Sequence, residues 1–169
     1  MRPEALLLAL LAAPAWAGLA WAGGLDGRTV LIRVEVWDEP AEPFLQSRDY
    51  AGAVGTGVEF GVEWEGSLAL AVVPVDVDVS DGRIDLDYER AEGDGVFANA
   101  KFNGYVLSFP VECTLLLGAE VDLAATTGAL KGARLTLEPQ ALRIDLAGLP
   151  HGPKDRLGVA LDVADCPIS

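Results

Sequence analysis

The segment VDVDVSDGRIDLDY, residues 75–88, decides the fold class. Asp81-Gly82 at its centre is a strong signal for a two-residue turn, because a type I′ turn needs positive φ at both of its positions. Once the turn is fixed, the register follows, and Asp78 faces Asp85 across the strand pair. The segment therefore predicts a β-hairpin with one apolar face and one acidic face.

The acidic face of this predicted hairpin is the first candidate site. It carries Asp76, Asp78, Asp85 and Asp87. Like charges opposed across strands are destabilising, and aspartate is a poor strand former. Two interpretations stay open, namely a solvated face that discourages edge-to-edge aggregation and a Ca²⁺ site built from hard carboxylate oxygens. No DxDxDG loop is present in the sequence, so no motif supports the calcium site.

The same period of two extends along the rest of the chain. Apolar and polar residues alternate over residues 30–36, 58–64, 68–72, 142–146 and 157–163. Each pattern is typical of a strand with one buried face. Together they predict an all-β, antiparallel β-sandwich of about eight or nine strands, jelly-roll or Ig-like. The best helix candidate, residues 121–131, is weakened by Thr126, Thr127 and Gly128.

Length and charge limit the class of protein. A chain of 169 residues is long enough for one domain with a sizeable core, and a hydrophobic fraction of 51% argues against disorder. The net charge of −14 argues against nucleic acid as a partner and disfavours docking on an anionic membrane. It is compatible with solubility and with divalent cations.

Residues 1–22 resemble a secretory signal peptide. Arg2 precedes an apolar run over residues 5–13, and small-x-small sites end at Ala17 and Ala22. An uncleaved anchor is the alternative, although Pro14 interrupts the segment. No later apolar stretch is long enough to span a bilayer. We expect a secreted or periplasmic protein whose single domain occupies residues 23–169.

The sequence contains two cysteines, Cys113 and Cys166. In an oxidising compartment they are expected to pair, and the bridge would tie the C-terminus to the strand that begins near Cys113. Two free thiols or an intermolecular bridge are the alternatives. A zinc site is disfavoured, because two cysteines without a nearby histidine cannot complete a tetrahedral set.

Candidate catalytic groups are few. The single histidine, His151, lies in a turn-rich segment, and the sequence has no G-x-S-x-G, HExxH or phosphate-binding glycine loop. We therefore expect a protein that is not an enzyme.

Aromatic residues give a second candidate site. Trp37 falls on the outward face of its predicted strand, while Phe44 and Tyr50 lie in residues 38–57, a predicted long loop. The three side chains are candidates for a carbohydrate-binding surface, against the alternative that they pack in the core.

Four short segments resemble a known family. They are VGTGVEF at residues 54–60, VDVSDGRIDL at 77–86, FNGY at 102–105 and LRIDLAGL at 142–149. They look like the β-rich domain of small bacterial secreted proteins of the PEP-CTERM-associated type. The resemblance implies export and a β-sandwich, and it implies no mechanism. The chain ends in CPIS without a Pro-Glu-Pro sorting tag, so sorting by that route is not expected.

The sequence thus favours an exported, non-enzymatic β-sandwich that serves as a binding or structural module. A Ca²⁺-dependent carbohydrate-binding or surface-adhesion module is the first alternative, with a glycan or cell-surface partner. An exported hydrolase is the second. The ligand, the oligomeric state and the strand order do not follow from the sequence.

Overall fold

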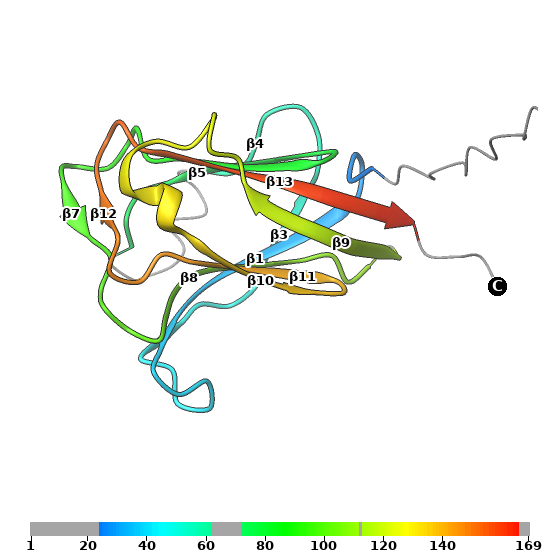
Figure 1. The fold of residues 1–169 in the computed structure, drawn as a ribbon. Coiled ribbons are helices and arrows are strands. Elements are labelled where there is room, and N and C mark those ends of the chain that lie inside the picture. The colour runs from blue at the N-terminus through cyan, green and yellow to red at the C-terminus, as the bar shows by residue number, and fades with distance from the viewer. Residues whose placement is uncertain (1–23, 62–71, 112, 166–169) are drawn as a thin grey trace, which may run out of the picture.

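The computed structural model describes residues 24–61, 72–111 and 113–165. These residues form thirteen strands and one short 3-10 helix, and eight of the strands span five residues or more. Figure 1 shows the strands packed as two layers. The fold is therefore an all-β sandwich, as the alternating pattern predicts.

Two antiparallel sheets make up the sandwich. Sheet A has the order β10-β11-β8-β1-β2, with β3 also paired to β1, and sheet B has the order β4-β5-β6-β13-β9. The strands of sheet A are β1 (Thr29–Trp37), β2 (Leu45–Gln46), β3 (Tyr50–Ala53), β8 (Phe102–Ser108), β10 (Arg134–Glu138) and β11 (Ala141–Asp145). Those of sheet B are β4 (Val58–Phe60), β5 (Asp76–Ser80), β6 (Arg83–Asp87), β9 (Thr114–Val121) and β13 (Arg156–Asp165).

Smaller elements close the remaining end of the molecule. Strands β7 (Gly95–Val96) and β12 (Pro150–His151) pair with each other, and the 3-10 helix η1 (Gly128–Gly132) contacts β12. Leu130 of η1 is fully buried. Among the described residues, helical structure is limited to η1, which overlaps only the end of residues 121–131, where the sequence offered its best helix candidate.

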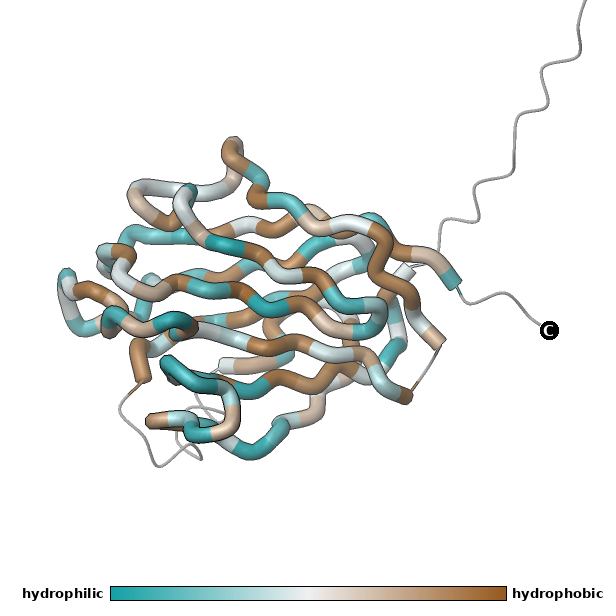
Figure 2. Tube along the Cα trace, turned by 60° about the horizontal axis from the view of Figure 1, so that its bottom comes forward, coloured by the Kyte–Doolittle hydropathy of each residue, from teal (hydrophilic) through white to brown (hydrophobic). Residues whose placement is uncertain are grey.

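The core lies between the two sheets and is built from alternate residues of each strand. Figure 2 shows hydrophobic and hydrophilic bands that follow one another along the strands. The buried residues include Val30, Ile32 and Val34 of β1, Val77, Val79, Ile84 and Leu86 of the hairpin, Leu142 and Ile144 of β11, and Leu157 and Val159 of β13. A period of two places these side chains on one face of each strand, which explains why they meet.

The predicted hairpin register is confirmed. Strands β5 and β6 pair Asp78 with Asp85 and Val77 with Leu86 around the Asp81-Gly82 turn. The strand order of sheet B then places β13 beside β6. The acidic residues consequently lie on the outer face of sheet B.

Two predictions for the N-terminal half are wrong in detail. Residues 38–57 are not a continuous loop, because β2 and β3 lie within them and pair with β1. Val58 was expected on the buried face with Phe60, but it is exposed, because the register of β4 against β5 shifts between these residues. The predicted strand residues 62–71 lie outside the described part of the chain.

The leader and one cysteine also lie outside the described residues, which begin at Gly24 and end at Asp165. Cys113 directly precedes β9, where Thr114 pairs with Asp165 at the end of β13. Arg28 donates a 2.9 Å hydrogen bond to the carbonyl of Cys113 and forms an ion pair with Asp165. The pairing of Cys113 with Cys166 stays a prediction, and it agrees with this register.

Among the described helices, none has the length and hydropathy needed to cross a membrane.

Candidate functional site

The four aspartates of the hairpin lie together on the outer face of sheet B, and three of them are paired with arginines. Arg90 contacts Asp76 at 2.7 Å, and Arg156 contacts Asp87 at 3.0 Å. Arg83 hydrogen-bonds to both carboxylate oxygens of Asp85. The positive charges of these arginines reduce the repulsion between the aspartates of the two strands.

Arg83 extends across three strands. Its Nη1 donates a 2.6 Å hydrogen bond to Asp122, which directly follows β9, while its Nε and Nη2 stay on Asp85 of β6. Hydrogen bonds to these two carboxylates raise the pKa of Arg83. Between them the guanidinium passes over Gly158 of β13, where a Cβ atom would overlap Nη2.

Asp78 differs from its neighbours, because no arginine contacts it within the described ranges. Burial raises the pKa of Asp78, and the charge of Asp85 opposite raises it further. No group of three or more His, Cys, Asp or Glu side chains among the described residues is placed to hold a metal ion. The calcium site therefore stays a prediction that no ligand cluster in this part of the chain supports.

The three predicted aromatic residues do not share one cavity. Phe44 is 70% exposed and lines an apolar cavity with Val36 and Leu45. Tyr50 lies in β3, packs against the core and is covered by the Arg48 guanidinium, 4.7 Å from the ring centroid. Trp37 lines a different cavity, on the outer face of sheet A, whose lining combines aromatic and charged residues.

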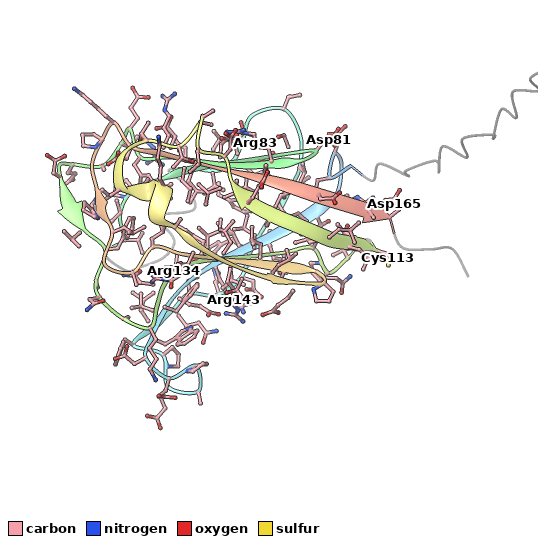
Figure 3. All side chains as sticks on the ribbon, viewed as in Figure 1. Asp81, Arg83, Cys113, Arg134, Arg143 and Asp165 are labelled. Carbon is pink, nitrogen blue, oxygen red and sulfur yellow. The ribbon has the colours of Figure 1, made fainter. Side chains whose placement is uncertain are left out.

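We call this second space the Trp37 cavity. It has a volume of about 410 Å³, within the range of ligand pockets. Its lining comprises Trp37, Pro40, Lys101, Phe102, Arg134, Thr136, Arg143 and Asp145. Strand register brings these residues together, since Trp37 pairs with Phe102, Thr136 with Arg143 and Arg134 with Asp145. Figure 3 shows Arg134 and Arg143 on the opposite side of the sandwich from Arg83.

The Trp37 ring is held from two directions. It stacks on Phe102 with 5.3 Å between centroids and 18° between planes. Its Nε1 donates a 3.1 Å hydrogen bond to Glu35, which is only 5% exposed. A ring fixed by a second ring and by a buried carboxylate loses little freedom when a ligand binds to it.

Glu35 also organises the basic side of the cavity. It accepts hydrogen bonds from Arg33 and, at 2.9 Å, from Nη1 of Arg143. Burial alone would raise the pKa of Glu35, but the bonds from Arg33 and Trp37 and the charges of Arg33 and Arg143 outweigh burial and lower it. The alternating pattern gave no reason to single out Glu35. The available signal was Arg33-x-Glu35-x-Trp37, which places all three side chains on one strand face.

Asp145 positions Arg134 by hydrogen bonds, as Glu35 positions Arg143. Its carboxylate accepts 3.1 Å and 3.0 Å bonds from the backbone N–H groups of Asn103 and Ala147, and Arg134 donates to it through Nε and Nη2. The Arg134 side chain is 57% exposed, and its Nη1 donates no hydrogen bond to any residue that the structure describes. The cavity therefore offers a positioned guanidinium with free donors.

The apolar cavity of Phe44 has a volume of about 420 Å³, and a further cavity beside His151, Glu92 and Asp94 has about 430 Å³. The His151 ring packs 4.7 Å from Phe97, and its buried Nδ1 has no hydrogen-bond partner among the described residues. In a Ser-His-Asp triad a carboxylate accepts a hydrogen bond from that nitrogen and orients the ring. No described residue does this for His151.

Comparison of the chain with protein-family models, with curated proteins and with solved structures gave no match. The resemblance to PEP-CTERM-associated proteins therefore stays a prediction.

Proposed function

We propose that this protein is an exported, non-catalytic binding module that recognises a saccharide in the Trp37 cavity. Export rests on the leader-like residues 1–22, and the binding role rests on the cavity. The two proposals fit together, because an exported β-sandwich meets polysaccharides outside the cell.

The observation that carries the proposal is the fixed Trp37–Phe102 stack beside Arg134. A sugar ring has a C–H face that packs on an aromatic ring and a rim of hydroxyls that accepts hydrogen bonds. An indole combines an apolar body with directional geometry, and the neighbouring guanidinium supplies donors in a fixed plane. Few polar groups at defined positions beside an apolar wall are typical of ligand sites.

The carboxylates near the cavity support binding without hydrolysis. Glycoside hydrolysis needs one carboxylic acid that is protonated at working pH, which requires a raised pKa. Glu35 has a lowered pKa instead, and the Asp145 carboxylate accepts bonds from two backbone N–H groups and from Arg134. Both carboxylates accept hydrogen bonds that position the basic and aromatic side chains.

Binding to a panel of immobilised neutral and acidic polysaccharides tests the proposal. The parent protein is expected to be retained on at least one of them. Trp37→Ala removes the stacking ring and is expected to weaken that binding about tenfold or more, because aromatic anchors dominate binding energy. Phe44→Ala is the matched control, since Phe44 is an exposed aromatic outside the Trp37 cavity.

Retention of the parent on no polysaccharide would contradict the proposal. Equal binding by Trp37→Ala and the parent would also contradict it. Circular dichroism of each variant checks that the sandwich is intact, and Trp37 at the end of β1 is a position where truncation leaves the buried face of that strand unchanged.

A further inference from the structure

We infer that the Trp37 cavity selects acidic saccharides, whose sugar rings carry a carboxylate. This inference rests on the proposed function and specifies its ligand class. The cavity lining contains the cations Lys101, Arg134 and Arg143 against the single carboxylate Asp145. Within this lining the cations outnumber the carboxylates, whereas the whole chain has a net charge of −14.

The partners of these cations leave part of their charge available. Lys101 contacts Glu39 at 2.7 Å, and Arg143 contacts Glu138 and the buried Glu35. Those three glutamates do not line the cavity. A ligand inside it therefore meets the cations more closely than the acids that balance them.

Arg134 is the residue best placed to receive a ligand carboxylate. Asp145 fixes one edge of its guanidinium through Nε and Nη2. The free Nη1 and the exposed outer edge remain for a second acceptor, and a guanidinium binds carboxylates in a planar geometry. Because the group is already positioned, little side-chain entropy is lost on binding.

The charge distribution over the whole molecule favours one direction of approach. The outer face of sheet B carries Asp76, Asp78, Asp85 and Asp87 in the hairpin that also contains Arg83. Figure 3 shows Arg83 on the opposite side of the sandwich from Arg134. Arginines pair with three of these aspartates, so the attraction of a polyanion rests on the cations that line the Trp37 cavity.

Polygalacturonate and its methyl ester provide a matched pair of probes for the full chain, because the two polymers share a backbone and differ in charge. We expect the de-esterified polymer to bind about tenfold more tightly or better, with an affinity that falls as salt rises. Arg134→Gln is expected to remove most of this preference. Arg156→Gln is the control, since Arg156 is equally exposed and pairs with Asp87 on sheet B.

The outcomes separate the inference from the function on which it rests. Equal affinity for both polymers, or binding only to neutral polysaccharides, overturns the acidic preference and leaves saccharide binding standing. A preference unchanged by Arg134→Gln overturns the role of this cavity in it. Equally tight, Trp37-dependent binding of a single-stranded DNA oligomer shows a general anion site and overturns the inference. Binding to no saccharide overturns the function as well.

Discussion

Asp78 is the one hairpin aspartate that no arginine contacts among the described residues. Its neighbours Asp76 and Asp87 have arginine partners, whereas Asp78 faces Asp85 and has none among the described residues. Burial, followed by the charge of Asp85, raises the pKa of Asp78 above its ordinary value. Ionised Asp78 therefore costs stability at neutral pH.

Asp78→Asn is expected to stabilise the protein by about 0.5 kcal/mol at pH 7, because it removes one of two opposed like charges. A carboxyl with a raised folded pKa is most favourable when protonated, so the advantage of the variant disappears as the pH falls below that pKa. Urea denaturation at pH 7 and pH 3 measures this difference. Asp87→Asn, which loses an arginine partner, is the control and gains no stability. Lower stability of Asp78→Asn at pH 7 would contradict the charge assignment.

The sequence was least informative about which individual residues form the candidate site. Trp37 was identified because it is an aromatic at an outward strand position. Glu35 and Arg143 were not, because an alternating strand gives every outward charge the same appearance. Their role depends on β1 and β11 lying on either side of β8, and that strand order is a long-range feature. The alternation of apolar and polar residues within one strand contains no information on the strand order.

At the scale of elements, alternation predicted several of the long strands, whereas β10 (Arg134–Glu138) and the short strands were not predicted. The hairpin register followed from Asp81-Gly82, and the buried residues of β1, β11 and β13 followed from alternation. Strands β2 and β3 have two and four residues, which is too few for a period to be recognised. They form because residues 38–57 return along β1, whose free edge offers hydrogen-bonding groups.

Gly158 in β13 lets Arg83 connect β6 to the end of β9. A Cβ at this position would overlap the Arg83 guanidinium and lie 3.0 Å from the Cβ of Ala125. Gly158→Ala is expected to destabilise the protein by about 1 kcal/mol, the lower end of the usual cost of overpacking, because the end of the Arg83 side chain can shift. Thermal unfolding compares it with the control Gly93→Ala, where a new Cβ has no atom within 4 Å. Equal melting temperatures for the two variants would contradict the packing described for Arg83.

At the scale of the whole molecule, the two sheets present different surfaces. Sheet B carries the acidic hairpin with its arginine partners, and sheet A carries an aromatic pair with three cations. Of the three cavities described above, only the Trp37 cavity has more cations than carboxylates in its lining. The whole chain, in contrast, has a net charge of −14. This asymmetry is the basis for assigning binding to sheet A, and it was visible only once the strands were arranged in two layers.

Binding of an acidic saccharide in the Trp37 cavity is tested by following the indole N–H resonance of Trp37 by NMR while oligogalacturonate is added. Trp37→Phe assigns the signal by its loss. We expect this resonance to shift in a saturable manner together with the amides of Arg134 and Arg143, while the amides of Asp78 and Gly158 on sheet B stay in place. An unmoved Trp37 resonance, or shifts confined to sheet B, would contradict it.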